Sequence, residues 1–217
     1  MLRFGPASGP VVMIAAPLFE EANRTRALLV AICRGLAERG LASALPDLPG
    51  TGESLIETRD ARLADWREAF AAAADVAGSR VLVLALRGGA LIEAEAAAVA
   101  RCHISPIDGA ALVRDLIRTR LAAARESGEA FDPAAIAPPG PPIALAGNTL
   151  SRALLAELLA ALPTRAERTV RLSSDPLPAD LKLNSAPLWR RAEPGQDLGF
   201  AHRIADDITE WAATCGS

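Results

Sequence analysis

The residues with the clearest potential for chemistry lie in the stretch 81–95, where an apolar run meets two glycines. Its first six residues are all apolar, Arg87, Gly88 and Gly89 interrupt the run, and an alanine-rich helical pattern follows. The guanidinium of Arg87 stays protonated and has no lone pair for attack on a substrate, so it cannot be a nucleophile. Together with the backbone N–H groups of Gly88 and Gly89 at the start of a helix, it could bind a carboxylate or a phosphate.

The alternative for Arg87 is an internal ion pair. Glu20 and Glu21 occupy the loop after the first clear strand and are the nearest acidic candidates. A buried charge is seldom left unpaired, so we favour the ion pair over an anion site. If the site were catalytic, one of these carboxylates would be the general base and Arg87 would hold the anionic group of the substrate.

Three more side chains near these loops are candidate binding residues. Phe19 precedes the two glutamates, and Asn23 is expected to be the N-cap of the first helix. Asp47 opens a glycine-rich loop just past a strand end, where it either fixes the loop by hydrogen bonds or contacts a ligand. Arg24 and Arg26 are expected on the solvated face of the first helix.

Other candidate nucleophiles and ligands are weaker. The three cysteines have no C-x-x-C spacing, which argues against a disulfide framework or a zinc site, and we expect no metal and no cofactor. Cys102 and His103 are adjacent on a predicted strand and would point to opposite faces. The three tryptophans lie within apolar patterns and are expected in the core, where Trp189 could also line a pocket.

Strands and helical segments alternate along the chain. The pattern predicts strands at 11–16, 41–45, 81–86, 102–107, 143–146, 169–172 and 188–191. It predicts helices at 27–39, 65–77, after the two glycines, 108–126 with Asp108 as cap, 151–162 with Ser151 as cap, and 200–213. This alternation indicates a single α/β domain over 1–217, with a doubly wound, mostly parallel sheet, helices on both faces and no sizeable lid.

The composition excludes several classes of function. Hydrophobic residues make up 51% of the 217, but no apolar run approaches the roughly 20 residues of a membrane span. The first residues lack the apolar core of a signal peptide, so we expect a cytoplasmic protein. A net charge of -3 with mixed signs gives no electrostatic basis for binding nucleic acid.

Several stretches resemble a known family. Residues 47–54 read Asp-Leu-Pro-Gly-Thr-Gly-Glu-Ser and are similar to the D-L-x-G-x-G-x-S loop of α/β-hydrolases. Residues 17–26 read Pro-Leu-Phe-Glu-Glu-Ala-Asn-Arg-Thr-Arg and resemble the P-F-x-E-E-x-N-R-x-R segment of the exosortase A system-associated hydrolases of type 2. The same family is matched by the stretches 60–66, 86–91, 106–123 and 187–195. The resemblance extends over about residues 10–213.

The resemblance implies an α/β-hydrolase fold and a bacterial setting of exopolysaccharide production and PEP-CTERM protein sorting. Residues 85–89 then correspond to the G-x-S-x-G nucleophile elbow, with Arg87 at the position of the nucleophile. Asn148 falls at the place of the triad acid, and the loop 192–197 has no histidine, so Ser-His-Asp catalysis is not expected.

Two functional hypotheses follow from this. The favoured one is a catalytically inactive or unconventional accessory protein that binds an anionic small molecule, an acyl or carbohydrate ester, or a protein of the exopolysaccharide pathway. The alternative is a hydrolase of an acyl or carbohydrate ester, with Glu20 or Glu21 as general base and Arg87 as the anion-binding residue.

Overall fold

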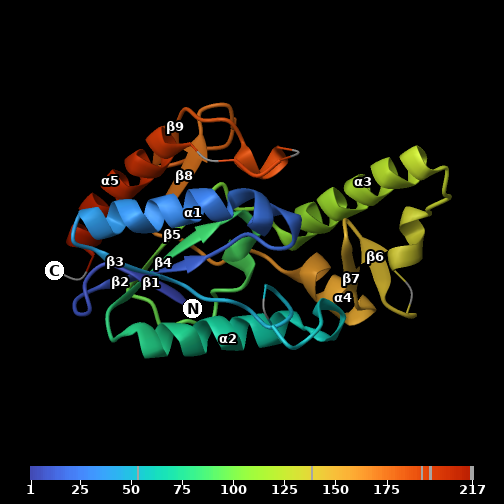
Figure 1. The fold of residues 1–217 in the computed structure, drawn as a ribbon, viewed down its shortest axis with the longest axis horizontal. Helices are drawn as coiled ribbons and strands as arrows, with labels where there is room; N and C mark the ends of the chain where they lie inside the picture. Colours follow the sequence, from blue (N-terminus) through green and yellow to red (C-terminus); the bar gives the residue numbers. More distant parts are fainter. Residues whose placement is uncertain (53, 138, 192, 196, 216–217) are drawn as a thin grey trace.

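The computed structural model describes residues 1–52, 54–137, 139–191, 193–195 and 197–215, and its centre is a seven-stranded sheet (Figure 1). Among the described strands the order is β1-β3-β2-β4-β5-β8-β9, and β1 alone runs antiparallel to its neighbour. The strands are β1 Leu2–Phe4, β2 Val11–Ala15, β3 Ala42–Leu45, β4 Val81–Leu86, β5 Ala100–Ile104, β8 Arg168–Leu172 and β9 Leu181–Leu183. The predicted mostly parallel sheet is therefore confirmed.

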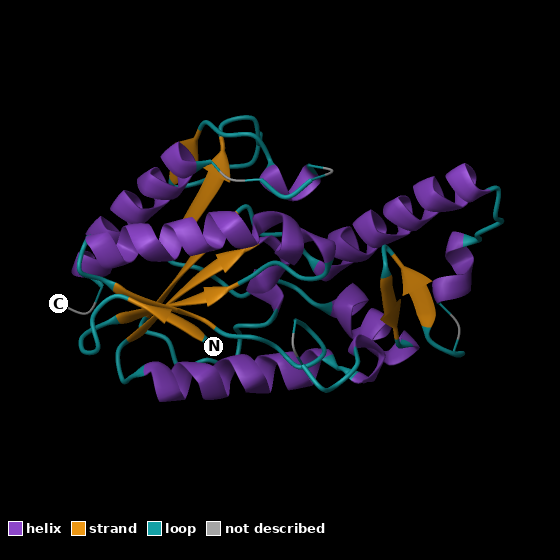
Figure 2. Ribbon diagram, in the orientation of Figure 1, coloured by secondary structure: helices purple, strands orange, loops and turns teal. Residues whose placement is uncertain are grey.

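Helices cover both faces of this sheet (Figure 2). Helices α1 (Glu20–Glu38) and α5 (Leu198–Thr214) lie on one face, and α2 (Leu63–Ala77) lies on the other. In β4, Leu82 and Leu84 belong to the core under α1 and α5, whereas Val83 belongs to the core on the α2 side, because successive strand residues point to opposite faces. Burial on both faces explains why this strand is apolar throughout.

The chain between β5 and β8 forms a small extension beyond the sheet. It contains α3 (Gly109–Ser127), a short 3-10 turn (Pro133–Ile136), β6 (Ile143–Leu145), β7 (Asn148–Leu150) and α4 (Arg152–Ala160). The strand predicted at 143–146 exists, but its assignment to the main sheet is wrong, since β6 pairs only with β7 in a separate hairpin. Ala146 and Gly147 both have positive φ (47° and 78°), which produces the tight two-residue turn between them. No large lid domain is present among the described residues.

Two predicted elements differ in kind from the observed ones. A short 3-10 helix, Arg87–Leu91, follows β4 in place of the expected α-helix, and Glu93 then turns into the interior. Residues 188–191 form a 3-10 turn (Leu188–Arg190) instead of a strand. Strands β1 and β9 were missed because both are three-residue edge strands with mostly half-exposed side chains. The structure does not describe three residues of the predicted segments: Glu53, and Ala192 and Gln196 of the loop 192–197.

The first helix begins earlier than predicted, which changes the role of Asn23. α1 starts at Glu20, its N-cap residue is Phe19, and no side chain caps it. The prediction of Asn23 as N-cap is therefore wrong, and Asn23 lies in the second turn of the helix. The caps predicted at Asp108 and Ser151 are confirmed, since their side chains accept hydrogen bonds from Ala111 N and Leu154 N. Within the described chain, no helix has the length and apolar character needed to cross a membrane.

Candidate functional site

The turn after β4 has the geometry of a nucleophile elbow with Arg87 at its apex. Arg87 has φ 55°, a left-handed conformation that is costly for a residue with a long side chain. Gly89 lies directly against β2, where an added Cβ atom would be 2.1 Å from the carbonyl oxygen of Ala15. Gly88 is buried under the side chains of Leu18 and Leu112. The two glycines thus allow the sharp strand-to-turn packing that points Arg87 out of the sheet.

Arg87 forms a nearly buried ion pair with Glu21 of α1. Its Nη2 donates to Glu21 Oε1 at 2.9 Å, and its Nε lies 3.2 and 3.3 Å from the two carboxylate oxygens. The side chains of Arg87 and Glu21 are only 8% and 11% exposed. Burial raises the pKa of Glu21 above its ordinary value, while the hydrogen bonds and charge of Arg87 act in the opposite direction. Of the two acidic candidates, Glu21 is therefore the one that pairs with Arg87.

Two further groups surround this guanidinium. The Trp189 ring stacks on it, with 5.0 Å between the guanidinium carbon and the ring centroid, a cation–π contact. Asp115 of α3 lies 3.7 Å from Arg87 Nη2 through its Oδ2. Arg24 Nη1 donates to the carbonyl oxygen of Trp189 at 3.2 Å and so connects α1 to the 3-10 turn that carries the ring. Glu20 points instead toward the hairpin, with its Oε1 beside Gly147.

Asn148, expected to follow a late strand of the main sheet, does not follow one. The next strand of the main sheet after β5 is β8, and the loop after it contains Asp175. The assignment of Asn148 is wrong because its strand belongs to the hairpin, where its side chain donates to Ala146 O at 2.9 Å. Burial raises the pKa of Asp175, but hydrogen bonds from Leu177 N and Arg171 bring it below its ordinary value.

Trp189 lies in the segment that follows the last strand of the main sheet. The loop after the last strand, β9, leads to the 3-10 turn that presents Trp189 to Arg87. The sequence has two histidines, and neither is there. His202 is exposed on α5, and His103 is buried in β5. The expectation that Trp189 is a core residue is correct for its burial, but sequence analysis missed its contact with Arg87.

A buried cluster around the carboxylate of Glu93 lies next to the elbow, and sequence analysis missed it. Glu93 is 0% exposed; His103 Nε2 lies 3.0 Å from its Oε1, Arg101 Nε donates to its Oε2 at 2.6 Å, and Thr164 also donates to it. The spacing of Arg101 and His103, two apart on one strand, was a usable signal, because such residues share a face. This cluster connects the elbow segment to β5 and to the loop before β8.

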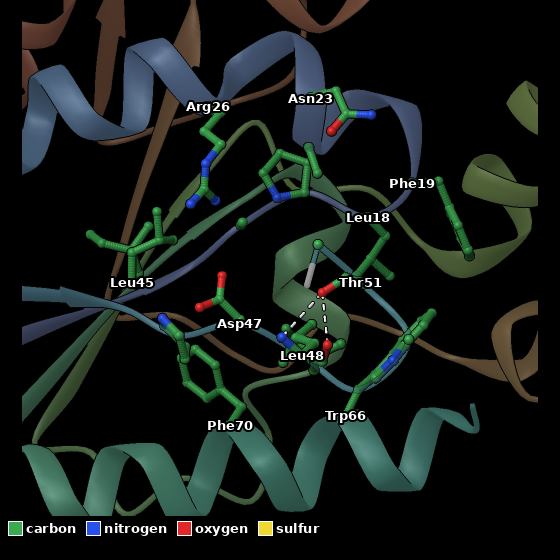
Figure 3. Close-up of a pocket in the computed structure, with 18 of the residues that line it drawn as sticks. Leu18, Phe19, Asn23, Arg26, Leu45, Asp47, Leu48, Thr51, Trp66 and Phe70 are labelled. Carbon is green, nitrogen blue, oxygen red and sulfur yellow. Dashed lines mark hydrogen bonds between the residues drawn. The ribbon is translucent and has the colours of Figure 1, made fainter. Parts of the chain in front are cut away.

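Two of the cavities that border the start of α1 hold predicted site residues, and Figure 3 shows the larger of these two. The larger, here called the α1–α2 cavity, has a volume of about 640 Å³ and lies between α1, the glycine-rich loop and α2; Phe19, Asn23 and Asp47 line it. The smaller, here called the Glu21 cavity, has a volume of about 290 Å³ and is lined by Glu20, Glu21 and Trp189. Of the predicted residues, Asn23 and Asp47 line the first cavity, Glu20 and Glu21 line the second, and Phe19 lines both. Arg87, Gly88 and Gly89 are buried and line neither.

The contacts of Asp47 and its loop differ from the prediction. Asp47 pairs with the N-terminal ammonium of Met1 at 3.1 Å and does not brace the loop. Thr51 and Thr58 brace it instead, through hydrogen bonds to the backbone of Leu48 and Gly50. Among the described residues, no group of three or more His, Cys, Asp or Glu side chains is placed to hold a metal ion.

Comparison with solved structures places this architecture among the α/β-hydrolases. Est1E from Butyrivibrio proteoclasticus, solved with ferulic acid bound, is similar with a TM-score of 0.59 and 17% identity over 97% of this chain and 90% of that one. Alpha/beta hydrolase domain-containing protein 10 from mouse is similar with a TM-score of 0.56 and 12% identity over 98% and 93%. No family model and no curated protein matches the sequence. At these identities the likeness establishes the α/β-hydrolase fold alone.

Proposed function

We propose that this protein uses an α/β-hydrolase fold to bind a ligand or partner without cleaving it, as an accessory protein of the exosortase A-linked system for exopolysaccharide and PEP-CTERM sorting. The observation that carries the proposal is the ion pair between Glu21 and Arg87 at the apex of the elbow, covered by the Trp189 ring. A guanidinium at this position cannot form an acyl intermediate.

The positions of the family-like segments support this proposal. Glu21 comes from the stretch 17–26, Arg87 from 86–91 and Trp189 from 187–195, which are far apart in the sequence. In the fold Arg87 contacts both Glu21 and Trp189. The stretches on which the resemblance rests thus converge on one cluster, as expected if the family shares this modified elbow.

The replaced triad places argue against conventional hydrolysis. Trp189 has no lone pair with which to take a proton from a nucleophile, and its indole N–H is only a donor. The Asp175 carboxylate accepts its hydrogen bonds from Arg171 and from the backbone of Leu177, and not from a histidine. A serine hydrolase needs nucleophile, base and acid in contact, and this arrangement supplies only the acid.

The test is ester hydrolysis by the purified protein and by matched arginine variants. With 4-nitrophenyl acetate and 4-nitrophenyl butyrate, we expect wild type, Arg87→Ser and the control Arg34→Gln to give the same rate, equal to the buffer background. Arg34 is exposed on α1, so its substitution makes a charge change of the same kind away from the elbow. Turnover by the wild type that disappears in Arg87→Ser but persists in Arg34→Gln would refute the proposal.

The alternative, hydrolysis with a glutamate as general base, is favoured by one observation. Glu20 and Glu21 both line a cavity, and the raised pKa of Glu21 gives its carboxylate more basic character. Glu21 would take a proton from water as the oxygen adds to the ester carbonyl, and would return it to the leaving alkoxide. Activity that rises with pH and is lost in Glu21→Gln would establish this mechanism, and loss only in Glu20→Gln would assign the base to Glu20.

The expected location and partners belong to the same proposal. The ligand would be an anionic small molecule or an acyl or carbohydrate ester, and the partner a protein of the exopolysaccharide pathway. The cytoplasm is the location predicted from the sequence. Fractionation of cells that produce the tagged protein tests the location directly, since a signal in the membrane fraction that resists high salt would contradict it.

A further inference from the structure

The α1–α2 cavity has the composition of a site for a small amphiphile. Its volume of about 640 Å³ lies within the range of cavities that enclose small organic ligands. Figure 3 shows α1 on one side and α2 on the other, with Arg26 extending from α1 and Trp66 and Phe70 from α2. One wall is therefore apolar and aromatic, and the other carries a cation.

Within the described part of the chain, the one cationic side chain of the cavity, Arg26, comes from α1. Ala22, Arg26 and Leu29 follow at spacings of four and three residues, so their side chains lie above one another on the helix, and Asn23 flanks them. Asp47 is the one carboxylate among the described lining residues, and it is paired with the N-terminal ammonium. The charge of Arg26 thus remains available to an incoming anion.

The apolar wall is held in place before any ligand arrives. Trp66 Nε1 donates to Pro49 O at 2.8 Å, which ties α2 to the glycine-rich loop. The Phe19 ring meets Trp66 edge-on, with 5.7 Å between centroids and 66° between planes. Phe19 has φ 58°, a strained conformation for an aromatic residue, and such strain is concentrated at ligand sites and switches. A preformed wall lowers the entropy cost of binding.

We infer that the α1–α2 cavity binds a monocarboxylate with an aromatic or short acyl body, its carboxylate on Arg26 and Asn23 and its apolar part against Phe19. A guanidinium binds a carboxylate by two parallel hydrogen bonds, and the half-buried Phe19 ring offers an apolar surface that the buried Trp66 supports from behind. Arg87 cannot take this role while Glu21 occupies its guanidinium. The inference deepens the proposed function, on which it rests for the biological use of the ligand.

The tryptophans supply separate reporters for the two cavities. Trp66 lines the α1–α2 cavity, Trp189 lines the Glu21 cavity, and Trp211 lies on α5. In a ¹⁵N–¹H spectrum of the full chain, titration with 2-naphthoate should shift the indole signal of Trp66 and leave that of Trp211 in place. The signals are assigned with Trp189→Phe and Trp211→Phe. A shift confined to Trp189 would overturn the inference, because it would place binding in the other cavity.

Calorimetric titration with 2-naphthoate and uncharged 2-naphthamide tests the chemistry. Arg26→Gln should weaken naphthoate binding by about tenfold, a free-energy change of about 1.4 kcal/mol, and should leave naphthamide binding unchanged. Ala22→Leu should weaken both ligands by filling the cavity, and Arg34→Gln, an exposed arginine of the same helix, should affect neither. Absence of saturable naphthoate binding, or equal affinity in wild type and Arg26→Gln, would overturn the inference. Because no ester is cleaved in these titrations, their failure is distinguishable from failure of the proposed function.

Discussion

The buried carboxylate of Glu93 should be essential for holding the elbow segment in place. Glu93→Gln keeps the shape but removes the charge that Arg101 Nε contacts at 2.6 Å and His103 Nε2 at 3.0 Å. Removal of one partner of a buried ion pair destabilises a protein by about 3–5 kcal/mol, because the other charge is left uncompensated. The Arg101 side chain is 19% exposed and can regain some hydration, so we expect the lower end, about 3 kcal/mol.

Urea denaturation at neutral pH, followed by tryptophan fluorescence, measures this loss. Glu95→Gln is the matched control, since Glu95 is exposed in the same segment and should change the free energy of unfolding by less than about 0.5 kcal/mol. In a thermal scan a loss of this size corresponds to a decrease of roughly 6–12 °C in Tm for a chain of this length. Equal stability of Glu93→Gln and Glu95→Gln would refute the reasoning.

The pH dependence of the same difference provides a second test. Burial raises the pKa of Glu93, but hydrogen bonds from His103, Thr164 and Arg101 bring it below the ordinary value of 4.5. A carboxyl group with a lowered folded-state pKa contributes stability that is present above pH 4.5 and is lost as the pH falls through the folded-state value. The stability gap between wild type and Glu93→Gln should therefore be constant near neutral pH and should shrink below pH 4.5. A gap that widens on acidification would contradict the assigned direction.

Two further predictions concern the elbow itself. Gly89→Ala should prevent the native packing of β4 on β2, or cost more than about 3 kcal/mol, because its Cβ would lie 2.1 Å from Ala15 O. In Gly140→Ala the Cβ would meet only the Arg152 side chain, at an ordinary contact distance of 3.8 Å, so this variant should be neutral in the same denaturation assay. Glu21→Gln should change the free energy of unfolding by less than about 1 kcal/mol at neutral pH, less than Glu93→Gln does, because the raised pKa of Glu21 means that folding disfavours its charged form, whereas the lowered pKa of Glu93 means that folding favours it. Because its pKa is raised, the stabilising contribution of Glu21 is complete below pH 4.5 and is lost as the pH rises through the folded-state value. The free energy of unfolding of wild type should therefore increase relative to that of Glu21→Gln as the solution is acidified. A relative increase at high pH would refute this direction.

The sheet was largely predictable because its signals are local. The run 81–86 is apolar throughout, and a strand buried on both faces requires this. Asp108 and Ser151 cap their helices as expected, because a cap depends on residues three positions away. Helix α1 was placed seven residues late, since its first two turns carry charged side chains that face the two cavities and obscure the apolar pattern.

The site was only partly predictable because its contacts are long-range. We predicted that Arg87 pairs with Glu20 or Glu21 because a buried charge needs a partner. Glu21, at the start of α1, is that partner, although 66 positions of sequence separate it from Arg87. The mistaken acid place of Asn148 arose from the hairpin turn at Ala146 and Gly147, which lacks the usual Asn-Gly or Asp-Gly signal. The contact between Trp189 and Arg87 depends on the course of the chain after β9, which no local pattern indicates.

The side chains around Arg87 complement one another in charge and shape. Here Glu21 neutralises Arg87, Trp189 covers the guanidinium, and Arg24 holds the backbone of Trp189 from the same helix. The elbow also keeps its strained φ at Arg87, a conformation that costs about 1–2 kcal/mol and that a purely structural turn could avoid with glycine. The charge, ring and backbone contacts around Arg87 therefore hold it in a conformation that the shape of the turn alone would not require.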